Sequence, residues 1–217
     1  VGCTDYDYES ERRLLNHFQE RRLCAIILIG YAMQNTEIIN NLIESGRPCV
    51  VMWEKLESRQ ISYVGIDNRK AAYSATSHLL NLGHRRIGLI AGPYSLVRRV
   101  RNRWQGYRDA LAEYNVPYEP ELVFERTPSL VEGKVAAEQL LSQENPPTAI
   151  FAASDTLAIG AMQAIHERGY KMPRDISLVG FDDIEVASYL NPSLSSVRVD
   201  GFQIGKLAAE IAIETAS

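Results

Sequence analysis

Short apolar segments rich in β-branched residues alternate along this chain with longer segments whose apolar residues recur every three or four positions. The first kind predicts strands buried on both faces, and the second predicts amphipathic helices. Regular alternation of the two is typical of a parallel sheet covered by helices on both sides, so the predicted fold class is α/β. The predicted strands are 25–30, 49–53, 63–66, 86–91, 149–153 and 176–181.

The intervening segments predict seven helices. Asp155 is expected to cap the helix that begins at 157, and Gly83 and Gly169 follow two helices where a left-handed residue is favoured. No linker is long enough to separate independent domains, but 217 residues suffice for two lobes of about 100 residues each. The predicted helices are 9–22, 37–45, 69–82, 104–114, 131–141, 157–168 and 202–214.

The charge balance and the cysteines narrow the class of protein. A net charge of −4, from 27 acidic and 23 basic residues, argues against tight binding of nucleic acid by this segment. Cys3, Cys24 and Cys49 have no metal-ligand spacing, and the last two sit in apolar runs that predict buried, reduced thiols. With no apolar run near the ~20 residues of a membrane helix and no signal peptide, we expect a soluble, cytoplasmic protein.

The sequence contains none of the common catalytic motifs. It has no glycine-rich phosphate loop, no HExxH and no GxSxG, and its histidines (His17, His78, His84 and His166) are scattered. An α/β chain of this length without such a group of residues is more often a binding module. We therefore expect a protein that is not an enzyme and that uses no metal or cofactor.

Polar and aromatic side chains follow the predicted strands at the ends where open α/β sheets place their ligands. Asp67 leaves one strand, Phe151 and Ser154 lie at the end of another, and Asp182 belongs to an Asp-Asp pair after a third. Arg103 is expected to open a helix after a long loop, where its guanidinium can fork to two ligand oxygens. Each residue alone has a structural alternative, namely helix capping, turn formation or core packing. Together they predict a pocket for a sugar-like molecule.

Four long stretches of this chain resemble the lactose-repressor/galactose-repressor family of bacterial transcription regulators. They occur in the family's order and at family-like spacing, and the resemblance covers nearly the whole chain. The stretches are LGHRRIGLIAGP at 82–93, PTAIF at 147–151 with SDTLAIGAM at 154–162, PRDISLVGFDDI at 173–184, and NPSLSSV at 191–197.

The resemblance implies two Rossmann-like lobes of the periplasmic binding protein type 1, with an effector bound in the cleft between them. The first, incomplete lobe would comprise 1–83 plus 198–217, and the second 84–197. The resemblance also implies a homodimer. The residues implied as effector contacts are Asp67, Arg103, Phe151, Ser154 and Asp182, and those implied at the dimer interface, where core packing is the alternative, are Ile159 and Leu190.

The chain departs from the family pattern at both ends. No helix-turn-helix head precedes Val1, and the first strand and helix of the first lobe and the last strands after Ser217 are absent, so we expect a longer polypeptide. The resemblance implies that effector binding selects one orientation of the lobes and so sets the spacing of two DNA-reading heads. Operator DNA would be contacted only through those heads. Whether the effector releases or promotes DNA binding stays open.

Arginines crowd the segment that carries the predicted effector contact. Such a charge run is usually a solvated face, but it also suggests an anionic effector, such as a sugar phosphate or sugar acid, because guanidinium groups match phosphate and carboxylate. The effector is therefore expected to be a sugar, a sugar phosphate or a sugar acid. The arginines are Arg98, Arg99, Arg101, Arg103 and Arg108.

Two other classes share this layered architecture. A periplasmic sugar-binding protein of a transporter is the main alternative, and a signal peptide upstream of Val1 would identify it. A dehydrogenase is the third possibility, which the missing glycine-rich loop disfavours.

Overall fold

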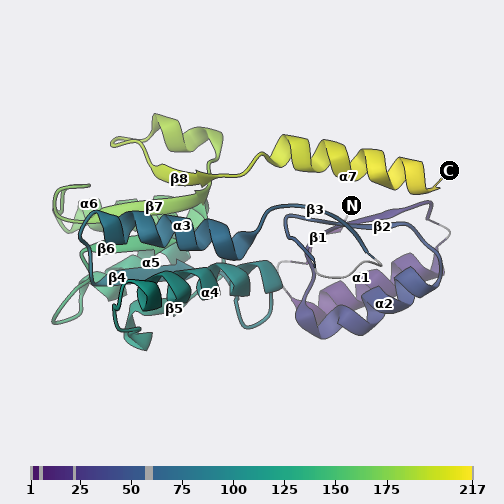
Figure 1. The fold of residues 1–217 in the computed structure, drawn as a ribbon, viewed down its shortest axis with the longest axis horizontal. Coiled ribbons are helices and arrows are strands. Elements are labelled where there is room, and N and C mark those ends of the chain that lie inside the picture. The colour runs from purple at the N-terminus through teal and green to yellow at the C-terminus, as the bar shows by residue number, and fades with distance from the viewer. Residues whose placement is uncertain (1, 5–6, 22, 57–60, 217) are drawn as a thin grey trace. The chain divides into compact units, whose positions relative to one another are not determined.

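The structure is a computed structural model that describes residues 2–4, 7–21, 23–56 and 61–216. The chain divides into two compact units, and each has its own parallel sheet (Figure 1). The predicted α/β class with parallel sheets is thereby confirmed. Unit 1 comprises Val1–Asp67, Ser95–Arg101 and Asp200–Ser217, and unit 2 comprises Asn68–Tyr94 and Asn102–Val199.

Unit 1 contains a three-stranded sheet in the order β1-β2-β3, with helices on both faces. On one face, α1 and α2 contribute Leu15 and Ile39 to a core that also contains Val51. On the other face, Ala208 of α7 packs against Val50. The elements are α1 (Tyr8–Glu20), β1 (Ile26–Ile29), η1 (Met33–Asn35), α2 (Thr36–Glu44), β2 (Cys49–Met52), β3 (Ser62–Val64) and α7 (Gly201–Ala216).

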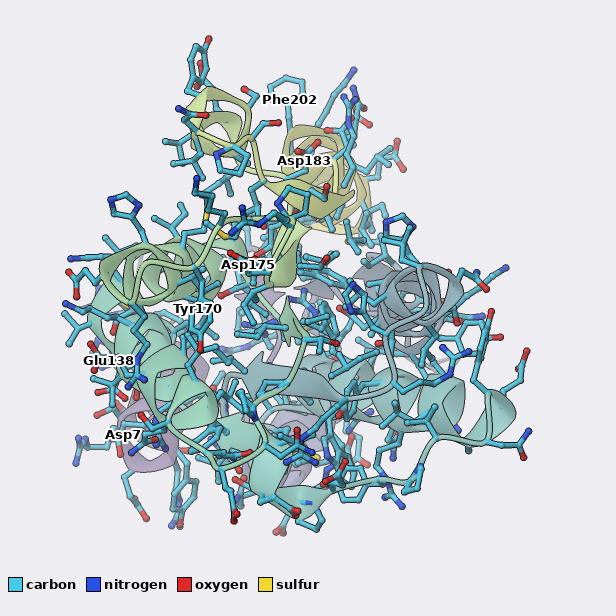
Figure 2. The ribbon with its side chains drawn as sticks, turned by 90° about the vertical axis from the view of Figure 1, so that its left-hand side faces the viewer. Asp7, Glu138, Tyr170, Asp175, Asp183 and Phe202 are labelled. Atoms are coloured by element: carbon cyan, nitrogen blue, oxygen red, sulfur yellow. The ribbon has the colours of Figure 1, made fainter. Side chains whose placement is uncertain are left out.

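Unit 2 contains a five-stranded sheet in the order β5-β4-β6-β7-β8, and all neighbouring strands are parallel. Tyr170 and Asp175 lie in the connection between α6 and β7 (Figure 2). The elements are α3 (Asn68–Asn81), β4 (Ile87–Ala91), α4 (Arg98–Glu113, of which the residues from Asn102 on belong to this unit), η2 (Pro120–Leu122), β5 (Val123–Glu125), α5 (Leu130–Leu141), β6 (Ala149–Ala152), α6 (Asp155–Glu167), β7 (Ser177–Asp182), η3 (Glu185–Tyr189) and β8 (Ser195–Arg198).

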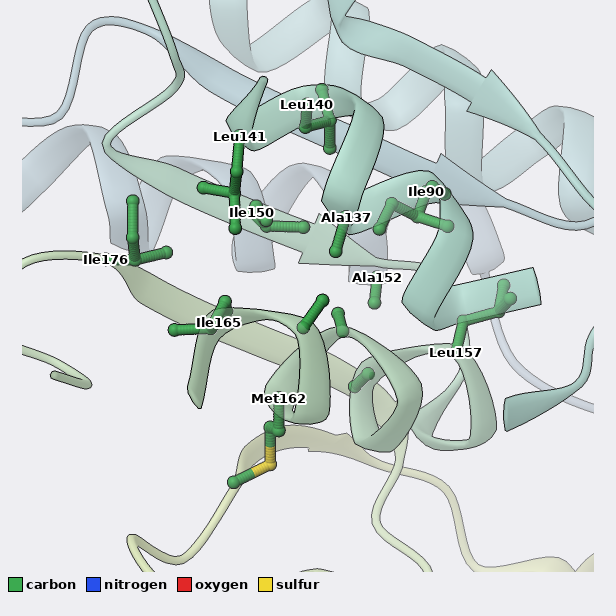
Figure 3. Packing of buried hydrophobic residues seen from close by; sticks show 14 of the residues in the cluster. Ile90, Ala137, Leu140, Leu141, Ile150, Ala152, Leu157, Met162, Ile165 and Ile176 are labelled. Carbon is green, nitrogen blue, oxygen red and sulfur yellow. The ribbon is translucent and has the colours of Figure 1, made fainter. Parts of the chain in front are cut away.

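One hydrophobic core of unit 2 lies between the sheet and the helix pair α5 and α6 (Figure 3). Ile90 of β4 and Ile150 of β6 meet Leu140 of α5 and Ile165 of α6, and all four side chains are fully buried. Burial of a side chain of this size contributes about 1.5–3 kcal/mol. The apolar spacing of three and four in both helices therefore fixes which helix faces turn toward the sheet.

Two strands and one helix start were not predicted. The strands β5 and β8 are short and contain Glu125, Ser195 and Arg198, so they lack the continuous apolar run that marks a buried strand. Helix α4 begins at Arg98, and the prediction that Arg103 opens this helix is wrong. The sequence predicts a loop up to Arg103, but arginine is a good helix former, and the arginine-rich segment forms the start of α4.

The N-cap of α6 is Ser154, whose side chain accepts a hydrogen bond from the backbone N–H of Leu157. The prediction that Asp155 caps this helix is therefore wrong, because Asp155 is its first helical residue. Serine and aspartate are both good N-caps, so the sequence does not distinguish between them. The carboxylate of Asp155 instead accepts hydrogen bonds from Ile184 and Ser196, which are distant in sequence.

The division into units differs from the predicted lobe boundaries at α3 and at Ser95–Arg101, and by two residues at 198–199, which belong to unit 2. Helix α3, predicted for the first lobe, belongs to unit 2 because it packs on β6 and β8. The segment Ser95–Arg101 belongs to unit 1, where Val97 forms a bridge with Ala32 and the backbone carbonyl of Leu96 accepts a hydrogen bond from Met33. Such long-range contacts leave no mark in local sequence patterns.

The three cysteines occupy different environments. Cys49 is buried at the start of β2, and burial raises the pKa of its thiol to about 11. Cys3 and Cys24 are exposed, so the prediction of a buried Cys24 is wrong, because this residue precedes the buried part of β1. Within the described residues, no helix is long and apolar enough to cross a membrane, and no group of side chains could hold a metal ion.

Candidate effector site in unit 2

Arg103 is the centre of a polar cluster at the end of the unit 2 sheet. Its side chain rises from α4 and is 5% exposed. Its Nε donates a hydrogen bond to Asn68 Oδ1 at 2.8 Å, and its Nη1 donates to the backbone carbonyl oxygen of Ala153 at 2.6 Å. Two donor groups of the guanidinium are thus used to fix its orientation, because a planar fork can serve several acceptors at once.

The third contact of Arg103 is with Asp182, the last residue of β7. The Nη2 atom of Arg103 lies 3.5 Å from Asp182 Oδ1, and the Asp182 side chain is 27% exposed. A nearly buried cation therefore faces a partly accessible carboxylate. This pair offers both hydrogen-bond donors and acceptors, which suits the paired hydroxyl groups of a sugar.

An aromatic layer lies beside the guanidinium. The central carbon of Arg103 is 3.6 Å from the centroid of the Phe181 ring, which is a cation–π contact. Phe151 of β6 is tilted against Phe181 with ring centroids 6.5 Å apart. Both rings are fully buried, so Phe181 packs against the guanidinium and Phe151 packs against Phe181.

Close packing of two helices brings Arg103 to Asn68. Gly106, one turn after Arg103 on α4, lies against the start of α3, and a Cβ atom there would clash with the carbonyl oxygen of Arg69. A side chain at position 106 would therefore force α4 away from α3. Arg69 also forms a two-bond ion pair with Asp109, at 2.5 and 2.9 Å, which joins the same two helices.

The structure brings together some of the predicted effector residues but not all of them. Arg103 and Asp182 are in contact, as described above. Phe151 is completely buried in β6 and supports Phe181, which is the core-packing alternative for this residue. Ser154 is half-buried and caps α6. Asp67 is exposed, ends unit 1 and directly precedes α3.

Three groups in this cluster were not selected from the sequence. Asn68 and Phe181 each adjoin a predicted site residue, and the backbone carbonyl of Ala153 adjoins Ser154. The positions of Asn68 and Phe181 next to predicted strand ends could have identified them as site residues. The carbonyl oxygen carries no sequence signal, since every residue has one.

The crowded arginines do not share one target. Arg98 contacts the hydroxyl of Tyr31, and Arg99 donates to the backbone carbonyl of Ile29, both within unit 1. Arg108 is exposed and lies over the ring of Trp104. Since their partners lie in different places, the run of arginines does not by itself form one anion-binding cluster.

The two predicted dimer residues lie in unit 2. Ile159 is half-buried on α6, and Leu190 is half-buried after η3, where it packs against the core of α5 and α6. Core packing, the alternative role of Leu190, therefore explains why at least part of its side chain is buried.

Residues 76–216 match the family model of the periplasmic binding protein-like domain. Among curated proteins, the ribose operon repressor of Haemophilus influenzae is 42% identical over 143 residues, which are 65% of this chain and 42% of that protein. The chain thus spans less than half the length of that relative.

Solved structures give the same result over more of the chain. A transcriptional regulator of the LacI type from Bacillus cereus subsp. cytotoxis has a TM-score of 0.88 and 31% identity, over 100% of this chain and 76% of its own. A LacI family regulator from Enterococcus faecium with bound ribose has a TM-score of 0.80 and 28% identity, over 93% and 74%. The resemblance found in the sequence is thereby confirmed: this chain belongs to the periplasmic binding protein-like family, in the form found in LacI-type transcription regulators.

Proposed function

We propose that this chain is the effector-binding core of a LacI-type transcription regulator and that it binds a neutral sugar through Arg103 and Asp182. The observation that carries the proposal is the fixed guanidinium of Arg103 beside the partly exposed carboxylate of Asp182 at a strand end. Ligands of open α/β sheets bind at this end of the strands. The ribose repressor and the ribose-bound regulator named above support a sugar as the ligand class.

A neutral effector fits the charges better than an anionic one. The positive charge of Arg103 is already balanced by Asp182, and an incoming phosphate would meet that carboxylate as well as the guanidinium. Hydroxyl groups can instead accept from the guanidinium and donate to the carboxylate. We therefore favour a neutral sugar over a sugar phosphate or a sugar acid.

The relatives are transcription regulators, so we propose regulation and not catalysis as the role of this chain. The alternative of a transporter's sugar-binding protein finds no support among these named relatives. Operator DNA, contacted through a head domain, and a homodimer that uses Ile159 and Leu190 are parts of the same proposal. Asp67 and Ser154 stay predicted effector contacts, each of which its own variant would test.

The test is calorimetric titration of the chain with ribose, other neutral pentoses and hexoses, and ribose 5-phosphate. We expect at least one neutral sugar to bind, and more tightly than its phosphorylated form. Asp182→Asn should weaken that binding by about tenfold or more, since it removes a charged hydrogen-bond partner. The neighbouring Asp183→Asn is the matched control and should change affinity less than twofold.

Two results would contradict the proposal. The first is the absence of binding by any sugar in the panel at millimolar concentration. The second is equal loss of affinity in the Asp182 and Asp183 variants, because a specific contact cannot be reproduced by its neighbour.

A further inference from the structure

Asp155 is a completely buried carboxylate that the effector site described above does not use. It is the first residue of α6, and its two oxygen atoms point to other parts of unit 2. Ser196 Oγ donates to Asp155 Oδ1 at 2.6 Å, and the backbone N–H of Ile184 donates to Asp155 Oδ2 at 2.8 Å. Buried carboxylates need such partners, since an uncompensated one costs several kcal/mol.

The partners of Asp155 lie on both sides of the turn that follows β7. Ser196 belongs to β8, and its hydroxyl oxygen accepts a hydrogen bond of 3.1 Å from the backbone N–H of Asp183. The N–H group of Ile184 therefore donates directly to Asp155, and the N–H group of Asp183 is connected to Asp155 through the hydroxyl group of Ser196. Asp182, which faces Arg103, is the residue immediately before this pair.

The backbone of this turn adopts an uncommon conformation. Asp182 has a φ of 109° and Asp183 a φ of 54°, both in the region that favours glycine. Residues held in such conformations persist because the surrounding contacts fix them. The hydrogen bonds that connect Asp183 and Ile184 to Asp155 fix the turn in this way.

The strand itself leaves room for the Asp155 carboxylate. A Cβ atom at Gly180 of β7 would clash with Asp155 Oδ1, so any larger residue would displace the carboxylate. Burial raises the pKa of Asp155, while the bonds from Ser196 and Ile184 act against that rise. The site thus keeps a carboxyl group in an unfavourable buried position where its hydrogen bonds hold the turn.

We infer that Asp155 is a positioning residue that sets the direction of Asp182 toward Arg103 and thereby sets the affinity for the effector. This inference rests on the proposed function, because it assigns Asp155 a role in the same site. Asp155 itself does not need to contact the effector.

The test is a double-mutant cycle of Asp155→Asn and Asp182→Asn, and the readout is the affinity for the neutral sugar of the titration panel that binds the unchanged chain most tightly. The amide side chain introduced by D155N keeps the size of the carboxylate but cannot accept both hydrogen bonds, since one of its oxygens is replaced by a donor. In the otherwise unchanged chain, D155N should weaken binding by about tenfold. In the D182N background it should weaken binding less than twofold, because coupled residues are not additive.

A purely structural role would give the same factor in both backgrounds, and that result would overturn the inference. Asp175→Asn is the matched control, since Asp175 also accepts a backbone hydrogen bond in unit 2, from Lys171, and is paired with Arg174. It should leave sugar affinity within twofold of the unchanged chain. If D155N does not fold, Ser196→Ala takes its place in the cycle, because it removes both the bond from Ser196 to Asp155 and the bond from Asp183 to Ser196 but leaves the bond from Ile184.

A second readout needs no ligand and separates this inference from the proposed function. Amide hydrogen exchange at Asp183 and Ile184 should become at least about tenfold faster in D155N, while exchange in α5 should not change. Unchanged exchange at both amides would overturn the inference even if sugar binds. If no sugar binds the unchanged chain, the proposed function fails, and the exchange rates alone decide whether Asp155 holds the turn.

Discussion

At the scale of single residues, Arg103 shows how a side chain can be both buried and functional. Its guanidinium serves Asn68, the carbonyl of Ala153 and Asp182, and it stacks on Phe181. These contacts leave little freedom in its position. A preformed group of this kind loses little conformational entropy when a ligand binds, which favours affinity.

Replacing Arg103 by lysine should separate charge from geometry. Lysine keeps the positive charge, but a single ammonium group cannot reach three acceptors in different directions. We expect Arg103→Lys to lower the free energy of unfolding by about 1–3 kcal/mol, because buried acceptors lose their donors. Urea unfolding followed by circular dichroism measures this change.

Arg108→Lys is the control for that measurement, since Arg108 is exposed on the same helix. We expect a change within about 0.5 kcal/mol. If the two lysine variants were equally stable, the contacts of Arg103 would contribute nothing to the folded state.

At the scale of elements, the close pair α5 and α6 determines the packing on one face of the unit 2 sheet. Two glycines, one on each helix, lie where the backbones meet. A Cβ atom at Gly133 would clash with the carbonyl oxygen of Leu157, and one at Gly160 with that of Leu130. Small residues at such positions let the two helices approach, as the shared core requires.

Gly160→Ala should therefore destabilise the protein although alanine is the better helix former. The added methyl group must push α6 away from α5, and overpacking of this kind costs about 1–3 kcal/mol. Gly205→Ala on α7 meets no atom within 4 Å and should be neutral or stabilising. Thermal unfolding of both variants tests the difference, and a lower Tm for Gly205→Ala than for Gly160→Ala would refute the packing argument.

His84 links the beginnings of neighbouring strands in unit 2. Its ring nitrogens lie 2.9 Å from Thr148 Oγ1 and 2.9 Å from Ser177 Oγ. Burial lowers the pKa of His84 from its ordinary value of 6.5. The folded state therefore takes up the proton at lower pH than the unfolded chain does.

It follows that His84 makes stability depend on pH in one direction. Its contribution is fully present above pH 6.5 and is lost as the pH falls from there through the lower pKa of the folded state, because the unfolded chain is protonated first. His84→Asn should flatten the fall in unfolding free energy between about pH 7.5 and about pH 5, measured by urea denaturation at each pH. His166→Asn, on α6, controls for removal of a histidine elsewhere. An unchanged slope in the His84 variant would show that other groups cause the dependence.

At the scale of the whole chain, the charge makes binding to DNA unfavourable. The net charge is −4, and most non-specific affinity for DNA comes from neutralisation of phosphates by basic residues. We expect this chain alone to bind duplex DNA more weakly than about 100 µM at physiological salt, with or without sugar. Fluorescence anisotropy with a labelled duplex measures this, with an isolated helix-turn-helix domain as the positive control. Micromolar binding would mean that this segment contacts DNA itself.

The sequence by itself determined the α/β class, most of the helices and the central strands, because these depend on the local spacing of apolar residues. It also identified the family, since four ordered stretches were preserved. Asp182 could be selected because it lies at a predicted strand end, and Arg103 because it follows the loop after another strand, although the helix start predicted there was wrong. The sequence could not find β5 and β8, whose residues pair at the edges of the sheet without a strong apolar pattern.

Only the tertiary structure decided which groups meet. Arg103 is 79 residues from Asp182 and 35 from Asn68, and no local pattern records such contacts. The same holds for Asp155, whose local role as a helix cap was plausible but was taken by Ser154. Hydrogen bonds from Ile184 and Ser196 fix its carboxylate, and those bonds exist because parallel strands bring distant segments to one end of the sheet.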